Sequence, residues 1–161
     1  MIAQILHRLM HQSPDLITSR LYNDQTFYKT FVSDIALSKK EVIIESPFIT
    51  TGRVEMLLPT IRKAVSRGVK IVVNTRQPQE HDTYMCREAE SSVSTLLDYG
   101  AKVLFTGGHH RKIVIVDRSI LWEGSLNALS QNNSCEVMRR VESGLLASQM
   151  IDFTGIRKFL A

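Results

Sequence analysis

The chain has too few cysteines for a disulfide framework or a zinc site. Only Cys86 and Cys135 occur among its 161 residues, and they stand far apart. A small disulfide-stabilised protein needs several cysteines, and a zinc site needs closely spaced ligand pairs. We therefore expect a protein of a reducing compartment that is stabilised by a packed core.

Long apolar runs are also missing. No stretch of about 18 apolar residues occurs, so the sequence predicts no transmembrane helix. The first eleven residues contain Arg8 and two histidines within an interrupted apolar pattern, which is unlike a secretory signal. These absences favour a cytoplasmic protein with no stable membrane association.

The length predicts one domain spanning residues 1–161, with residues 1–20 as an N-terminal helical extension. In that extension, apolar residues recur at helical spacing over residues 2–12. Hydrophobic content is 43% and charged content is 22%, which is ordinary for a globular protein. The formal net charge of +4 and pI near 9.2 favour a polyanionic partner.

Helical and strand patterns alternate along the rest of the chain. Helices are expected to begin near Asn23, Arg53, His81 and Ser143. Strands are expected at residues 41–45, 69–73, 101–105, 113–116, 120–122 and 134–141. A helix, a glycine and then a valine-rich strand suggest βαβ crossovers. The prediction is an α/β fold with a mixed, largely parallel β-sheet and helices on both faces. For Glu45, at the end of one strand, a role behind an active site and a solvated carboxylate both remain open.

The polar residues that could take part in catalysis are concentrated in residues 109–127. His110 and Lys112 are two apart in an extended segment, so their side chains project to the same face. A hairpin turn at residues 117–119 would return the chain, so that Ser125 and Asn127 come back near the start of the first strand. An imidazole, a cation and two neutral hydrogen-bonding groups suit a phosphate. No pair of carboxylates with metal-ligand spacing stands beside His110.

Taken alone, each of these residues is best explained as an ordinary solvated side chain. Their combination at fixed gaps favours a functional site instead. The pattern H-x-K, four residues, Asp, six residues and G-S-x-N resembles the phospholipase D superfamily signature. The resemblance covers roughly residues 24–160 and is specific at 109–127. The six motif positions are His110, Lys112, Asp117, Gly124, Ser125 and Asn127.

The resemblance implies a phospholipase D-like α/β/α sandwich. Because only one motif is present, the chain looks like the single-motif branch, best known as bacterial nucleases. A homodimer is implied, in which two motifs form one active site. His110 would attack phosphorus, and the partner subunit's His110 would protonate the leaving oxygen and then activate water. Activity should therefore fall at both pH extremes.

The other roles also follow from the resemblance. Lys112 and Asn127 would hold the phosphate oxygens with support from Ser125, and Asp117 would be structural. Neither a metal nor another cofactor is implied. The family commonly carries a glutamate after the G-S-x-N turn that binds the motif histidine. Glu136 is the candidate, and a solvent-facing strand glutamate is the alternative.

These features predict a metal-independent phosphodiesterase, specifically an endonuclease of DNA or RNA. Arg76, Arg111 and Arg139, among other arginines, could follow a nucleic-acid backbone. One alternative is a phospholipase D-type lipid phosphodiesterase. A second alternative is a nucleic-acid-binding domain of a larger helicase or restriction protein.

Overall fold

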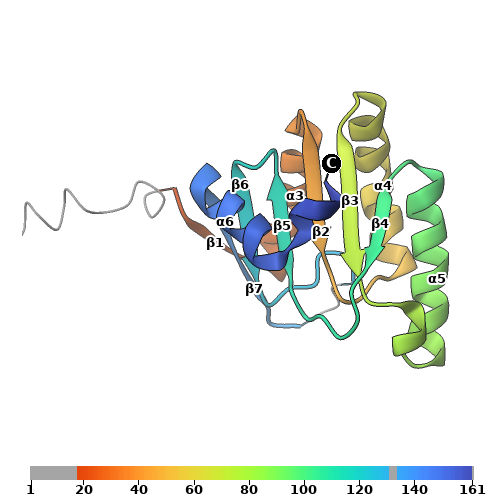
Figure 1. Cartoon of the computed structure of the whole chain (residues 1–161). Helices are drawn as coiled ribbons and strands as arrows, with labels where there is room; N and C mark the ends of the chain where they lie inside the picture. Colours follow the sequence, from red (N-terminus) through yellow and green to blue (C-terminus); the bar gives the residue numbers. More distant parts are fainter. Residues whose placement is uncertain (1–17, 131–133, 161) are drawn as a thin grey trace, which may run out of the picture.

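The computed structural model describes residues 18–130 and 134–160. The helix expected at residues 2–12 lies outside these ranges. Within them the chain forms one seven-stranded sheet in the order β1-β7-β6-β5-β2-β3-β4 (Figure 1). The strands are β1 Arg20–Asn23, β2 Glu41–Glu45, β3 Lys70–Thr75, β4 Lys102–Phe105, β5 Ile113–Val116, β6 Ile120–Gly124 and β7 Val137–Glu142.

The sheet is mixed, as expected, but the expectation that it is largely parallel is wrong. Strand β3 pairs in parallel with β2 and β4. The other four pairings of the described strands are antiparallel. The reason lies in the connections. A tight turn joins β5 to β6, and residues 125–136 connect β6 to the neighbouring β7. Helices connect β1 to β2, β2 to β3 and β3 to β4, but among the described strands only the last two connections join neighbours in the sheet, as parallel pairs require.

Helices cover both faces of the sheet, which confirms the predicted layers. One face packs on α3 Asp24–Leu37, α4 Thr51–Ser66 and α5 Thr83–Asp98. The other packs on α6 Gly144–Thr154 and the 3₁₀ turn η2 Ile156–Phe159. A further 3₁₀ turn, η1 Pro78–Glu80, follows β3.

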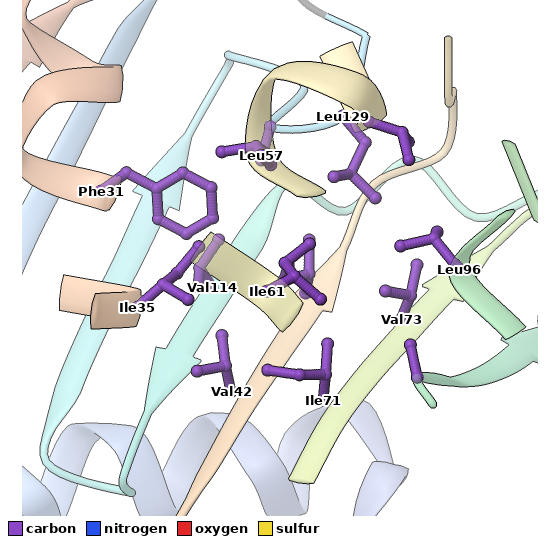
Figure 2. Close-up of a cluster of buried hydrophobic side chains, with 14 of the residues drawn as sticks. Phe31, Ile35, Val42, Leu57, Ile61, Ile71, Val73, Leu96, Val114 and Leu129 are labelled. Carbon is purple, nitrogen blue, oxygen red and sulfur yellow. The ribbon is translucent and has the colours of Figure 1, made fainter. Parts of the chain in front are cut away.

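Alternation along the strands divides the core between the two faces. Ile71 and Val73 of β3 join the larger cluster, whereas Val72 joins the smaller one. Figure 2 shows Leu57 and Ile61 of α4 in the larger cluster. Met56 of the same helix is exposed.

Polar side chains fix the starts of three helices where the sequence predicted them. Asn23 accepts a hydrogen bond from Thr26 N at 3.0 Å at the start of α3. Asp82 and Ser143 cap α5 and α6 in the same way, through Met85 N at 2.9 Å and Leu146 N at 3.1 Å. Each cap satisfies a backbone donor that lacks a partner within the helix.

Topology brings several strand ends to one edge of the sheet, the lower edge in Figure 1. Glu45 at the end of β2 is paired with Ile113 at the start of β5. Gly124 at the end of β6 is paired with Met138 near the start of β7. We call this the motif edge. Within the described ranges, no helix has both the length and the apolarity needed to cross a membrane.

Candidate active site

The H-x-K segment lies at the motif edge, directly before β5. The His110 side chain is exposed and that of Lys112 is half-buried. The ammonium of Lys112 donates to the carbonyl oxygen of His110 at 3.0 Å. This bond holds the ammonium at the backbone of His110, so that both residues can meet one phosphate.

Arg111, between these two residues, is bound to Glu45. Its Nε is ion-paired with Glu45 Oε2, and its Nη2 lies 3.4 Å from Oε1. Glu45 is only 1% exposed and also accepts from Asn74 Nδ2 at 3.3 Å. The interpretation of Glu45 as a solvated carboxylate is therefore wrong. The pair ties the H-x-K segment to the end of β2 from behind, since Arg111 alternates with its two neighbours.

The G-S-x-N turn reaches the same edge through the pairing of β6 with β7. Ser125 N donates to Val137 O at 2.9 Å, and Val137 N donates to Ser125 Oγ at 3.1 Å. Asn127 is half-buried, and its Oδ1 has no hydrogen-bond partner within the described residues. An exposed hydroxyl and an unused amide oxygen therefore stand at the strand ends that also carry His110.

Gly124 is required by a close approach of two strands. A Cβ atom built on it would lie 2.1 Å from Val137 O and 2.9 Å from Met138 Cα. No side chain fits between these backbones. The glycine thus permits the tight β6–β7 contact that fixes the backbone of Ser125.

Asp117 lies at the opposite end of β5, away from the other motif residues. Its carboxylate accepts from the backbone N–H groups of Lys39 at 2.8 Å, Lys40 at 2.7 Å and Glu41 at 3.0 Å. Asp117 and Arg118 have φ values of 52° and 53°, which gives the hairpin its tight turn. The carboxylate therefore joins the β5–β6 turn to the start of β2, at the end of these strands opposite the motif edge.

The expected hydrogen bond between Glu136 and His110 is not formed within the described residues. Glu136 is half-buried, and its Oε1 accepts from Ser134 Oγ at 3.4 Å. It directly precedes β7, whose first residue is bonded to Ser125. The carboxylate thus stands on the strand next to the G-S-x-N turn without meeting the imidazole of its own chain.

The three arginines expected to meet substrate all have carboxylate partners. Arg76 pairs with Glu80 at 3.1 Å, Arg139 with Glu123, and Arg111 with Glu45. Of the three acids, Glu45 alone is buried. A phosphate would replace the exposed partners of Arg76 and Arg139 more easily than that of Arg111.

Sequence reasoning missed His109, which precedes the motif histidine. It is 6% exposed, and neither ring nitrogen has a partner in hydrogen-bonding geometry within the described residues. Burial lowers the pKa of His109, more than nearby Glu45 raises it. The motif spacing selects His110 and gives His109 no role, and only the fold shows that the His109 ring is buried.

A hollow of about 560 Å³ lies beside the H-x-K segment and includes His110 and Lys112 in its lining. Its apolar side is formed by Leu21, Val137, Met150 and Phe153. Phe153 is 86% exposed and Leu21 is 73% exposed, which is unusual for side chains of their size. We call these four residues the apolar rim.

Within the described residues, no group of three or more His, Cys, Asp and Glu side chains is arranged to hold a metal ion. The polar groups at the motif edge are instead an imidazole, an ammonium, a hydroxyl and an amide. Their chemistry suits an anion with several oxygens.

Solved structures share this fold. NucT from Helicobacter pylori has a TM-score of 0.68 at 19% identity, over 84% of this chain and 91% of that chain. Nuc from Salmonella typhimurium, a phospholipase D family member, has a TM-score of 0.68 at 14% identity, over 84% of this chain and 90% of that chain. TrmBL2, an archaeal chromatin protein, has a TM-score of 0.56 at 10% identity, over 94% of this chain and 55% of that chain. At these identities the likeness shows a common fold.

A comparison with curated protein sequences finds no match. A family model described as the phospholipase D-like domain of cardiolipin synthase matches residues 31–153. This match spans most of the sheet, its helices and the complete motif, and it confirms the predicted family. The chain therefore belongs to the phospholipase D-like family of phosphodiesterases.

Proposed function

We propose that the protein is a nuclease that hydrolyses phosphodiester bonds of DNA or RNA through a covalent intermediate on His110, without a metal ion. The observation that carries the proposal is the gathering of five of the six motif residues at one edge of the sheet, with an exposed imidazole beside an ammonium. The positive net charge supports a polyanionic substrate.

In the first step, a ring nitrogen of His110 attacks phosphorus and the bond to the leaving oxygen breaks. The leaving oxygen takes a proton from the partner subunit's His110. In the second step, water gives a proton to the partner subunit's His110 and attacks phosphorus, and the phosphorus–nitrogen bond breaks. Lys112, Asn127 and Ser125 stabilise the charge on the phosphate oxygens.

This mechanism needs two histidines, and among residues 18–130 and 134–160 a single exposed histidine lies at the motif edge. A second copy related by a two-fold axis would supply the other. The apolar rim supports this arrangement, because it places exposed apolar surface directly beside His110 and Lys112. We propose that the two copies pair through the rim, with both motif edges in one active site.

The remaining predicted residues have supporting roles in this proposal. Glu136 would orient an imidazole once the two chains are paired, since it does not meet His110 within one chain. Arg139 would contact the nucleic-acid backbone by exchanging its solvated carboxylate partner, and Arg76 would face the backbone while keeping its bond to Glu80. Arg111 would hold the H-x-K segment through Glu45.

A lipid phosphodiester is the second candidate substrate. The same groups would attack it, and the matched family model is described for cardiolipin synthase. In that case the apolar rim would hold an acyl chain instead of a second protein copy. Phospholipid vesicles with release of the head group as readout separate this reading from the first.

The test is cleavage of labelled single- and double-stranded DNA and RNA in EDTA, by wild type and His110→Ala. Cleavage by wild type alone supports the proposal. Denaturing electrophoresis of protein quenched in alkaline detergent, which preserves the acid-labile phosphorus–nitrogen bond, should detect labelled product on wild type and none on His110→Ala. Cleavage that persists in His110→Ala would indicate a contaminant. If wild type leaves nucleic acid intact but cleaves phospholipid, the lipid candidate replaces the first.

A further inference from the structure

An aromatic ring lies next to the proposed nucleophile. Phe48 follows β2 on the loop that leaves the sheet at the motif edge. Its ring centroid lies 6.1 Å from that of His110 at an interplanar angle of 74°, and 5.0 Å from that of His81 at 37°. The guanidinium of Arg76 lies 5.9 Å from the Phe48 centroid. Phe48, His81 and Arg76, here called the Phe48 cluster, are half-buried.

Hydrogen bonds hold the loops that carry the Phe48 cluster. Arg76 pairs with Glu80, whose Oε2 also accepts from Gly108 N at 2.8 Å. Because Gly108 leads into the motif segment, Glu80 links the loop after β3 to the approach to His110. On the other side, Ser46 Oγ donates to Phe48 O at 2.9 Å. The position of the ring relative to the nucleophile is therefore set before substrate arrives.

The chemistry of the cluster suits a flat ring. Burial lowers the pKa of His81, with Arg76 contributing, which favours the neutral form of its imidazole. A phenyl ring and a neutral imidazole, with a guanidinium alongside, present π-faces and a cation to a ligand. Single-stranded nucleic acid is held in this way, through bases stacked on aromatic side chains beside positive charge.

We infer that the Phe48 cluster is a nucleobase subsite that binds the base next to the phosphate attacked by His110. The inference rests on the proposed function and narrows the substrate to single-stranded nucleic acid, because a paired base is not free to stack on a protein ring. The contact between the Phe48 and His110 rings places this subsite within one nucleotide of the reacting phosphorus.

The competing explanation is that Phe48 only orients the imidazole of His110. The two roles predict different effects on cleavage when the base is removed from the substrate. A short single strand, in DNA and in RNA form, is prepared with one cleavable phosphodiester and methylphosphonates elsewhere. The nucleotides flanking the cleavable bond are either intact or abasic. The measured quantity is the ratio of kcat/KM for the intact strand to that for the abasic strand.

Wild type should prefer the intact strand by about 10-fold, and Phe48→Leu should bring the ratio close to one. Phe48→Tyr, which keeps the ring, should preserve the preference. Phe159→Leu removes a partly exposed ring at the opposite end of the sheet and should leave the ratio unchanged. The ratio is insensitive to a general loss of active protein, because both strands are cleaved by the same molecules.

A wild-type ratio near one would overturn the subsite. An equal loss of kcat/KM on both strands in Phe48→Leu would also overturn it and would mark Phe48 as a positioning residue. Cleavage of duplex as fast as single strand would also overturn it. If wild type cleaves neither strand, the proposed nuclease function fails and the subsite fails with it. These outcomes are distinct, since only the last one involves a wild type without activity.

Discussion

The guanidinium of Arg111 is ion-paired with the buried carboxylate of Glu45, so the residue between His110 and Lys112 is anchored to the neighbouring strand. Removing one partner of such a pair leaves a charge without compensation. We expect Glu45→Ala to lower the free energy of unfolding by about 3 kcal/mol. Glu45→Gln, which keeps hydrogen-bonding atoms, should cost less. Urea unfolding followed by circular dichroism measures both.

The matched control is Glu123→Ala, which breaks the pair with Arg139 on the same sheet. Both partners there are substantially solvated. The expected loss is below about 1 kcal/mol, as for other surface ion pairs. Equal losses for Glu45→Ala and Glu123→Ala would show that the buried pair has no special part in holding the motif segment.

A substitution at Gly124 tests how closely β6 and β7, the strands beside the G-S-x-N turn, approach each other. Its hypothetical Cβ would meet Val137 O at 2.1 Å, a distance that no rearrangement of side chains relieves. Gly124→Ala should therefore destabilise the protein by about 3 kcal/mol and lower activity by displacing Ser125. Thermal unfolding and the cleavage assay measure the two effects.

Gly52→Ala is the control for this substitution. Gly52 lies in α4, and a Cβ there meets nothing within 4 Å. Because alanine favours helix more than glycine does, this variant should be as stable as wild type or more stable by up to about 1 kcal/mol. A stable and active Gly124→Ala protein would contradict the close approach of β6 and β7.

Much of this arrangement could be predicted from the sequence because local rules fix it. Caps at Asn23, Asp82 and Ser143 predicted helix starts, and the β-branched run of residues 113–116 predicted β5. The relative direction of neighbouring strands was harder to predict. It depends on the order of the strands in the sheet, and neither the pairing of β2 with β5 nor that of β1 with β7 is set by a local turn.

The partners of the site residues could not be predicted, because they are distant in sequence. For Glu45, a solvated carboxylate and a supporting role both stayed open, since nothing near it in the chain indicates Arg111. Likewise, only the packed structure brings Phe48 to His110 or buries His109 beside it. Motif spacing identifies the reacting groups, and tertiary contacts identify what holds them.

The buried ring of His109 predicts a pH dependence of stability. Its pKa in the folded state lies below the ordinary value of 6.5, mainly because of burial. As pH falls below about 6.5, the unfolded chain binds a proton that the folded chain does not, so stability falls. It continues to fall until the folded-state pKa is reached, by at most about 1.4 kcal/mol per pH unit for one proton.

Urea unfolding at a series of pH values from 7.5 to about 5 measures this slope. His109→Gln should flatten it, and the groups that interact electrostatically with His109, namely Glu45, Arg111 and His110, are unchanged in that variant. His81 also has a lowered pKa, so His81→Gln should remove a further part of the slope. An unaltered slope in His109→Gln would show that this ring titrates alike in the folded and unfolded chains.

The apolar rim predicts an association between two copies of the chain. Phe153 is almost fully exposed in the single chain and stands beside the proposed active site. Phe153→Asp would place a carboxylate in each half of a symmetric interface and remove two buried rings. Dimerisation should weaken by about 100-fold or more. Light scattering coupled to gel filtration measures it, and cleavage activity should fall with the dimer fraction.

Leu37→Asp provides a control of similar character, since Leu37 is an exposed apolar residue at the end of α3. It should leave the dimer and its activity intact. A Phe153→Asp protein that remains dimeric would place the interface elsewhere on the surface. A protein that is monomeric and fully active would show that one chain holds a complete active site, and the histidine that protonates the leaving oxygen would then have to come from the same chain.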